Sequence, residues 1–541
     1  MDLTERQDIC KASVTTAGSA TSRVPISAIS MILLTACVSL AWSHYRLLYR
    51  DEFWEMWTDR ISSIGQIIGI QLTNTVCLDP LAYHVLGHAC IRAFGANTFA
   101  IRLPALLSVL LMQVCLFIFV RRIATERTAV FAMGFPALTC AMGYSMEGRP
   151  YGLVLACFGV AMVSWQTAAH RETGRTFSLV TLGAAVALAL NTQYFGVLLL
   201  GPLCVAELFR TLQRKRFDLA MISSLVLGST AVVLALPFMK AAKELRGPYG
   251  GGFPSPKTII WAYIWTLANH TGTKLDRVMF VLVCLLVGIS LWACGRQLRR
   301  KALSSWKPEE VFLITLAALP FLGYVVALFA SPVLEPRFVI GVVIGISALT
   351  ALGLFSLDSS ERYEKLLLCA LFLTLGLTGI THVWMEYRAA TQMIESMKLN
   401  PEIRTALLSG ADQRLYIQDV ECFAFLTFYG TDPDVRSRIT LVYSTEQEEK
   451  WNKESVIPIY DRHLHNFAHI SITPFEQVAA EPGTHLFVDF AEPSLRAGKI
   501  RSLNWLGLAF AADHANTRLL GHAFQSNGGV AGDVVSVNFH P

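Results

Sequence analysis

Long apolar runs, each close to the length of a membrane-spanning helix, recur along the first 383 residues. About 20 predominantly apolar residues cross a bilayer as a helix. The runs predict about eleven transmembrane helices, near Val24–Trp42, Ala100–Val120, Ala129–Tyr144, Tyr151–Trp165, Phe177–Leu190, Tyr194–Leu208, Ala220–Phe238, Val278–Ala293, Val311–Ala330, Phe338–Phe355 and Leu366–Val383. Residues 1–23 are polar, and this stretch is too long before the first apolar run to look like part of a cleaved signal peptide, so we expect the first helix to be retained.

The pattern changes after residue 383. Short alternating runs appear at Arg414–Gln418, Ile439–Tyr443, His485–Phe490 and Val534–Phe539, separated by polar stretches that permit helices. About 150 residues are enough to build a separate core. We therefore expect a globular α/β domain over residues 384–541, a transmembrane module over residues 24–383 and an N-terminal tail over residues 1–23.

The connection over residues 45–97 is long and only partly polar. Phe53, Trp54 and Trp57 lead into an apolar stripe that suits a helix lying in the membrane interface. A second apolar stretch, Asp79–Phe94, is read as interfacial or re-entrant, because a full crossing would reverse the side on which the later basic loops lie.

Composition supports a membrane protein: 53% of the 541 residues are hydrophobic and 16% are charged, against about 25% charged residues in soluble domains. The basic residues form short clusters between apolar runs, which argues against a nucleic-acid-binding face. The cysteines are scattered, many of them inside apolar runs, and read as small buried hydrophobic residues.

The basic clusters predict the orientation, because cytoplasmic loops are enriched in Lys and Arg. Placing all of them in the cytoplasm puts the N-terminus there and the C-terminal domain outside. The clusters are Arg121, Arg122 and Arg127; His170, Arg171 and Arg175; Arg210, Arg214, Lys215 and Arg216; Arg296, Arg299, Arg300 and Lys301; and Arg362 and Lys365.

Three of the predicted external connections carry unusual charges. Asp51 and Glu52 follow the first helix and can either cap an interfacial helix or supply a general base that takes a proton from an acceptor hydroxyl. Glu147 and Arg149 occupy a tight turn, where they can form a salt bridge at a helix start or hold an anion. Arg337 can snorkel to the interface or grip a lipid phosphate.

These residues also carry a family resemblance. From about Tyr49 to Phe355 the chain resembles glycosyltransferase family 39 and its relatives: the protein O-mannosyltransferases, the aminoarabinose lipid A transferases and the RgtA/B/C/D-like group, all of GT-C fold. The motifs are Asp51-Glu52; Asp79-Pro80 with Tyr83; Phe94-Gly95; Arg102 with Pro104; Glu147-Gly148-Arg149-Pro150-Tyr151; Gln193-Tyr194-Phe195-Gly196; and Arg337-Phe338. Many relatives have other residues at Asp79, Gln193 and Phe338, which leaves the sugar open.

The resemblance implies a reaction and roles for residues. The donor would be a polyprenyl or dolichyl monophosphate sugar, and transfer would invert the anomeric centre in a single displacement. Asp51 would be the catalytic base, supported by Glu52, and Arg337 would lie near the donor phosphate. Arg149, Glu147, Tyr151 and Tyr194 would bind donor or substrate, and Asp79, Tyr83 and Arg102 would shape the pocket.

Several questions stay open at this stage. The acceptor can be a lipid, a glycan or a protein hydroxyl. A divalent cation is possible near Asp51, Glu52, Asp79 and Glu147, although no His lies among them. The main alternative function is a transporter or flippase for the same lipids, which performs no chemistry; a third is a membrane scaffold. We expect location in a bacterial inner membrane.

Overall fold

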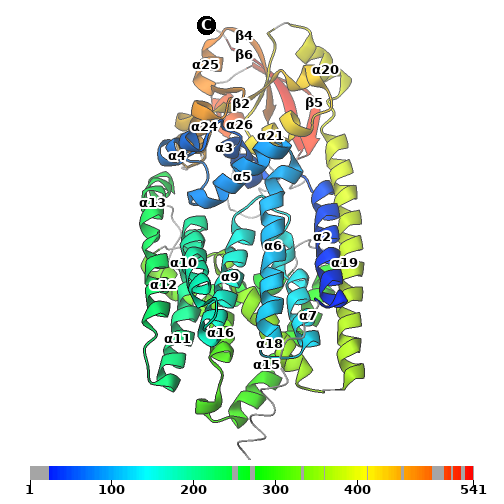
Figure 1. The fold of residues 1–541 in the computed structure, drawn as a ribbon. Helices are drawn as coiled ribbons and strands as arrows, with labels where there is room; N and C mark the ends of the chain where they lie inside the picture. Colours follow the sequence, from blue (N-terminus) through cyan, green and yellow to red (C-terminus); the bar gives the residue numbers. More distant parts are fainter. Residues whose placement is uncertain are drawn as a thin grey trace, which may run out of the picture.

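The computed structural model describes residues 24–246, 254–268, 274–330, 334–358, 360–410, 412–451, 456–489, 505–512, 516–525 and 531–539. A bundle of long helices forms one part of the molecule, and a small mixed sheet with its helices lies at one end of that bundle (Figure 1). Three short helices lie where the two parts meet. The candidate site is built at this junction.

Eight helical segments in the described part of the chain are long and apolar enough to cross a membrane. They are Ile26–Tyr45 (α2), Thr98–Arg121 (α6), Tyr151–His170 (α9), Arg175–Thr192 (α10), Tyr194–Arg214 (η2 and α11), Leu219–Glu244 (within α12, Leu219–Thr230, and α13, Val232–Arg246), Leu275–Arg300 (within α15, Lys274–Arg300) and Glu361–Ser396 (α19). The predicted class, a polytopic helical membrane protein with a small C-terminal sheet, is confirmed.

The other three predicted spans are helical but broken or short. Helices α16 (Pro308–Ala317) and α17 (Leu319–Ala330) meet at a 58° bend. The run at residues 129–144 divides into α7 (Glu126–Gly134), η1 (Phe135–Leu138) and α8 (Cys140–Tyr144). The last consists of η4 (Pro336–Val339) and α18 (Val342–Phe355). Apolar composition therefore located all eleven runs, whereas Pro136, Pro320 and Pro336 lie at or beside the breaks, where proline interrupts helical hydrogen bonding.

Helices α6 and α9 pack closely through small residues. A Cβ at Gly152 would lie 2.8 Å from the carbonyl oxygen of Ala105, so only glycine permits this approach. Gly148 likewise faces Ile101. Because Arg102 lies on α6 and Arg149 lies between the two glycines, this packing fixes the position of one arginine relative to the other.

Helices α3 (Arg50–Asp59), α4 (Ile64–Thr73) and α5 (Leu81–Phe94) lie between the bundle and the sheet (Figure 1). They occupy the connection for which interfacial helices were predicted. Aromatic side chains join α3 to the C-terminal domain: Trp54 stacks on Tyr460 with ring centroids 4.7 Å apart, and Phe53 contacts Phe425 edge-on at 5.7 Å. The helix that begins with Arg50 and Asp51 is thus packed against both parts of the protein.

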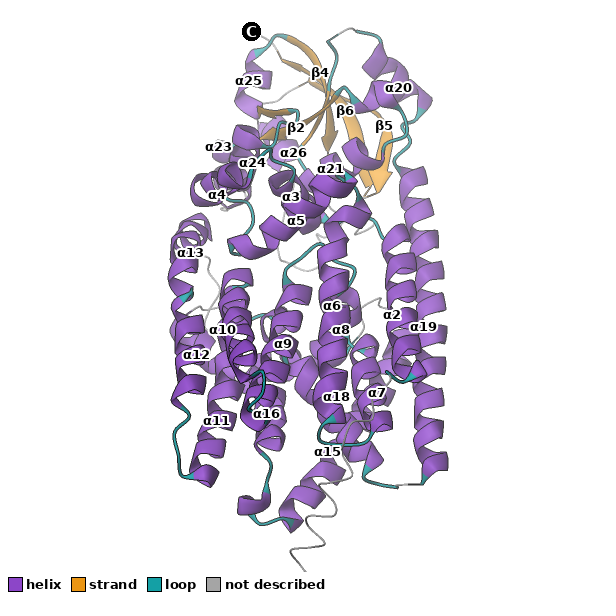
Figure 2. Ribbon diagram, viewed as in Figure 1, coloured by secondary structure: helices purple, strands orange, loops and turns teal. Residues whose placement is uncertain are grey.

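The C-terminal sheet has the strand order β3-β2-β1-β4-β6-β5, and β6 runs antiparallel to both neighbours (Figure 2). The strands are β1 (Leu415–Ile417), β2 (Ile439–Tyr443), β3 (Ile472–Pro474), β4 (Gly483–Asp489), β5 (Asn516–Gln525) and β6 (Ala531–Phe539). The helices are α20 (Pro401–Leu408), α21 (Val420–Tyr429), α22 (Pro433–Arg436), α23 (Thr445–Trp451), α24 (Val456–Phe467), α25 (Phe475–Ala480) and α26 (Trp505–Ala512). All four predicted strands are present; β3 and β5 were missed.

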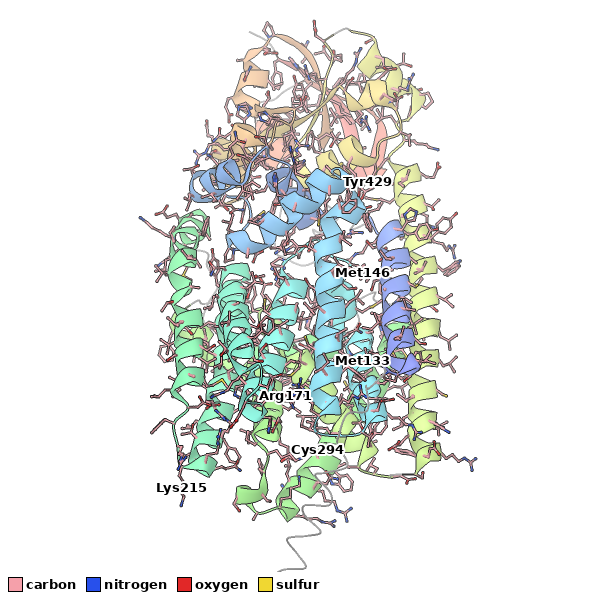
Figure 3. All side chains as sticks on the ribbon, viewed as in Figure 1. Met133, Met146, Arg171, Lys215, Cys294 and Tyr429 are labelled. Atoms are coloured by element: carbon pink, nitrogen blue, oxygen red, sulfur yellow. The ribbon has the colours of Figure 1, made fainter. Side chains whose placement is uncertain are left out.

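Residues of two predicted cytoplasmic clusters lie toward the end of the bundle opposite the sheet. Figure 3 shows Arg171 and Lys215 in the half of the molecule away from the sheet, whereas Tyr429 lies in the C-terminal domain, where it ends α21. The ends of α6, α11 and α15 that carry other basic residues lie on the same side (Figure 1).

Candidate active site

Asp51 and the two predicted phosphate-binding arginines meet at the junction of bundle and domain. Asp51 lies in the first turn of α3, Arg149 in the turn before α9, and Arg337 in η4. The Asp51 carboxylate forms an ion pair with Arg149, and its Oδ2 lies 4.0 Å from Nη1 of Arg337. Three segments separated by more than 280 residues of chain thus place one carboxylate between two guanidinium groups.

Asp79 and Tyr151 complete this cluster. Oδ2 of Asp79 lies 3.6 Å from Nη2 of Arg149. The Tyr151 ring lies under both guanidinium groups, 5.6 Å from Arg149 and 5.8 Å from Arg337, distances typical of cation–π contact. Burial raises the pKa of Asp79, and the charge of Arg149 opposes this shift. Arg337 also pairs with Glu335 at 2.5 Å.

Several donors of this cluster have no hydrogen-bond partner among the described residues. They are the Nε–H groups of Arg149 and Arg337, both buried, and the buried hydroxyl of Tyr194. Tyr194 begins η2, and the next ring, Phe195, stacks on Phe338 of η4 with centroids 4.6 Å apart. Buried donors are normally satisfied, so these groups are suited to an anionic ligand.

Glu52 has a different environment from its neighbour Asp51. It is fully buried, and Arg102 grips it with two hydrogen bonds of 2.8 and 2.7 Å. The backbone N–H groups of Gly148 and Tyr49 also donate to it, at 2.7 and 3.3 Å. Burial opposes ionisation, but the charge and hydrogen bonds of Arg102 lower the pKa of Glu52 overall. Both oxygens are occupied, so Glu52 ties α3, α6 and the Gly148 turn together.

Arg102 itself is 2% exposed and donates to three backbone carbonyls at the C-terminal end of α2 and just after it, those of Ser43, Arg46 and Leu47. Arg102 therefore supports the backbone around the cluster of Asp51, Arg149 and Arg337. Tyr83 is also buried, and its hydroxyl donates to the Ile101 carbonyl at 3.4 Å. These two residues were expected to shape the pocket; the structure places them in the supporting packing around it.

Glu147 faces α2 and the start of α3. Arg46 donates to it at 2.9 Å and the Tyr49 hydroxyl at 3.3 Å. Sequence reasoning missed Arg46 and Tyr49, which lie just before the predicted base. Their nearness to Asp51 in the chain was the available signal.

Each of the four acids considered for a cation forms an ion pair with an arginine: Asp51 and Asp79 with Arg149, Glu52 with Arg102, and Glu147 with Arg46. Within the described residues, the group of His, Cys, Asp and Glu side chains close enough to share a metal is Glu55, Cys77 and His84. Sequence reasoning missed this group, although Asp51, Glu55 and Asp59 repeat every four residues and so share one face of α3.

Comparisons with known proteins give relatives for the sequence and the fold. Residues 79–239 match the family described as dolichyl-phosphate-mannose-protein mannosyltransferase. Over 315 residues the chain is 21% identical to undecaprenyl phosphate-alpha-4-amino-4-deoxy-L-arabinose arabinosyl transferase 2 of Proteus mirabilis, covering 56% of this chain and 55% of the relative. The chain thus matches about half the length of this curated relative.

Solved structures extend the similarity over nearly the whole fold. ArnT from Cupriavidus metallidurans, bound to undecaprenyl phosphate, superposes with a TM-score of 0.54 at 14% identity, covering 93% of this chain and 97% of that one. Its apo form gives a TM-score of 0.51 at the same identity and coverage. The match over residues 79–239 and the shared fold confirm the resemblance of this chain to GT-C glycosyltransferases of the family 39 and ArnT type.

Proposed function

We propose that the protein is a membrane glycosyltransferase that moves a sugar from a polyprenyl-phosphate donor to a hydroxyl acceptor at the external membrane face. The observation that carries the proposal is the convergence of Asp51, Arg149 and Arg337. The names of its relatives support the same class of donor, since the Proteus protein is an undecaprenyl-phosphate-sugar transferase and the Cupriavidus ArnT binds undecaprenyl phosphate.

The two arginines are assigned to the donor phosphate. Their unpartnered Nε–H groups and the Tyr194 hydroxyl are buried donors at one site, and guanidinium groups bind phosphate oxygens bidentately. As the bond between the anomeric carbon and the phosphate oxygen breaks, negative charge grows on the phosphate. The same contacts then stabilise the leaving group.

Asp51 is assigned to the acceptor. Its carboxylate takes the proton of the attacking hydroxyl while the acceptor oxygen bonds to the anomeric carbon, which inverts that carbon in a single displacement. In the structure Asp51 pairs with Arg149. A phosphate that engages Arg149 and Arg337 would compete for this pairing and leave the carboxylate available as a base.

The external location rests on the distribution of charge. Basic loop residues such as Arg171 and Lys215 lie at the end of the bundle opposite the site (Figure 3), and such loops are cytoplasmic in most membrane proteins. This distribution supports our proposal that the site and the C-terminal domain face the external side of a bacterial inner membrane.

The test is incubation of the purified protein with a panel of polyprenyl-phosphate sugars and acceptors, with detection of free polyprenyl phosphate. We expect release with one donor, and a loss of about 10²- to 10⁴-fold in turnover for Asp51→Asn. Asp434→Asn, on the exposed surface of α22, is the matched control and should keep normal turnover.

The competing flippase function predicts a different result. A flippase would move labelled lipid across vesicles without changing it chemically, and it would tolerate Asp51→Asn. Unchanged turnover in Asp51→Asn would remove the proposed base, and failure to release polyprenyl phosphate from every donor would remove the enzymatic function.

A further inference from the structure

A second group of ionisable side chains lies beside the donor site and is not used by the proposed reaction. Glu55 and Asp59 come from α3, His84 from α5 and Cys77 from the segment between α4 and α5. Glu55 is 1% exposed, Asp59 2%, Cys77 6% and His84 0%. Two carboxylates, a thiol and an imidazole are thus enclosed together.

Their polar atoms converge on one side of the imidazole ring. Nδ1 of His84 lies 2.7 Å from Oδ1 of Asp59 and 3.2 Å from Oε2 of Glu55. Ligand atoms of Glu55, Cys77 and His84 all lie within 4.8 Å of one another. Oε2 of Glu55 receives no hydrogen bond from the described residues, although it is buried and faces this group.

We propose that Glu55, Cys77 and His84, with Asp59 beside them, bind one divalent transition-metal ion of the zinc type. Thiolate, imidazole and carboxylate are the ligand types that Zn²⁺ takes in proteins, commonly in sets of four. Asp59 supplies the additional negative charge and can provide the fourth ligand, because it faces the same ring nitrogen as Glu55.

The outer contacts of the cluster suit this assignment. Nε2 of His84, on the far side of the ring, lies 2.7 Å from the side-chain amide of Gln71. The Gln71 amide nitrogen donates to Nε2, while its oxygen accepts from the Thr75 hydroxyl, and these contacts fix the orientation of the ring. Nδ1 therefore carries the ring proton and would release it on binding the ion. The Thr58 hydroxyl lies 3.8 Å from the Cys77 sulfur and can donate to its thiolate.

The electrostatics of the cluster favour a cation. Glu55, Asp59 and Cys77 are all buried around one imidazole. Buried anions require compensation. A divalent ion would compensate the negative charge of Glu55, Asp59 and Cys77 together, whereas a single protonated imidazole would not.

The site would fix the catalytic helix. A metal joining Glu55 and Asp59 of α3 to His84 of α5 holds these two helices together one turn beyond Asp51. Asp79 precedes α5 and faces Arg149. The ion would therefore act by positioning Asp51 and Asp79, without contacting the sugar.

The test measures metal directly and uses no transferase assay, so it can fail or succeed independently of the proposed function. The full-length protein, purified in detergent without a metal-affinity tag, should contain about one zinc per chain by elemental analysis. Exchange with Co²⁺ should give near-ultraviolet absorption from thiolate-to-cobalt charge transfer.

Variants assign the ligands. Cys77→Ser should abolish the charge-transfer absorption, and His84→Asn should lower the metal content. Cys90→Ser, which alters a half-buried thiol of α5 outside the group, should leave both signals unchanged. If His84→Asn does not fold, the cobalt absorption of Cys77→Ser still tests the proposal. Wild-type protein without metal after incubation with Zn²⁺ or Co²⁺, or a Cys77→Ser protein with unchanged cobalt absorption, would overturn the proposal.

Discussion

Adjacent carboxylates in the site have different environments and so different expected roles. Asp51 keeps 24% of its side chain exposed between two arginines, whereas Glu52 is enclosed with both oxygens hydrogen-bonded. The sequence placed both at the start of one helix, and only the family resemblance distinguished Asp51, as the expected base, from Glu52, as its support. The difference arises from Arg102, 50 residues away, whose pairing with Glu52 depends on the packing of α6.

Glu52→Gln is expected to destabilise the protein. It leaves the buried Arg102 guanidinium without its counter-charge, and breaking one half of a buried pair costs about 3–5 kcal/mol. The apparent melting temperature in detergent should fall clearly, while Asp51→Asn should change it little. Equal melting temperatures for Glu52→Gln and wild type would contradict the structural role.

Arg337→Lys tests how the phosphate is held. Lysine keeps the charge but loses the planar fork. A hydrogen bond to a charged group contributes about 1.5–3 kcal/mol, so KM for the lipid donor should rise by about 10- to 100-fold. Arg436→Lys on the exposed surface of α22 serves as the control. A donor KM that stays at the wild-type value would separate Arg337 from the phosphate.

Asp461 provides a pH test outside the membrane-spanning segments. Burial and the carboxylates of Glu448 and Asp419 raise its pKa well above the ordinary value. The folded state therefore holds the proton, and the associated stability is lost as pH rises from about 4 through the folded-state pKa. Asp461→Asn does not titrate, so its advantage in melting temperature over wild type should grow with pH. A melting-temperature advantage that does not change with pH would contradict a raised pKa for Asp461.

At the scale of elements, the C-terminal domain supports the helix that carries the proposed base. Trp54 and Phe53 of α3 insert among Tyr460 and Phe425 of the domain. On the side of the helical bundle, Glu52 of α3 forms an ion pair with Arg102 of α6. The helix is thus held from both sides, which gives the domain a positioning role in addition to any contact with the acceptor.

Tyr460→Ala should show this coupling. Loss of an aromatic pair removes about 0.5–1.5 kcal/mol beyond the buried area, so α3 should become more mobile and turnover should fall more than donor binding. Phe177→Ala, at an exposed position of α10, is the matched control. Normal turnover in a folded Tyr460→Ala protein would show that the domain does not position α3.

The sequence predicted helices well in the part of the chain that is expected to lie in lipid. Each of the eleven apolar runs is helical, because a chain in lipid must satisfy its backbone hydrogen bonds internally. The positions at which the helices break were harder to predict from the sequence. Strand β3 has three residues and ends in Pro474, and β5 contains Gly521 with irregular pairing, so neither shows clear alternation.

At the scale of the whole molecule, the site depends on contacts between distant segments. Motif positions suggested Asp51, Arg149 and Arg337, but only folding shows that Arg149 lies between Asp51 and Asp79. Apart from the four-residue repeat of Glu55 and Asp59 in α3, the group around His84 has no recognisable spacing, because Cys77 and His84 come from two further segments. The local sequence pattern therefore identified the residues of the site more completely than it showed which of them pair with one another.

The orientation can be tested by labelling single cysteines, placed in a background without accessible native thiols, with a membrane-impermeant reagent. Lys215→Cys lies in an exposed loop between α11 and α12, and Ser409→Cys lies on the exposed surface after α20. In intact spheroplasts, Ser409→Cys should react and Lys215→Cys should react only after permeabilisation. The reverse pattern would place the proposed site in the cytoplasm.

Helix α19 has a further consequence for how substrates arrive. Its 36 residues measure about 54 Å at 1.5 Å per residue, against roughly 30 Å of hydrocarbon. It therefore extends beyond the bilayer and carries the sheet above α3 and α5 (Figure 1). Since the C-terminal domain lies over the helix that carries Asp51, the proposed function leads us to expect acceptors to enter from the side, along the lipid headgroups.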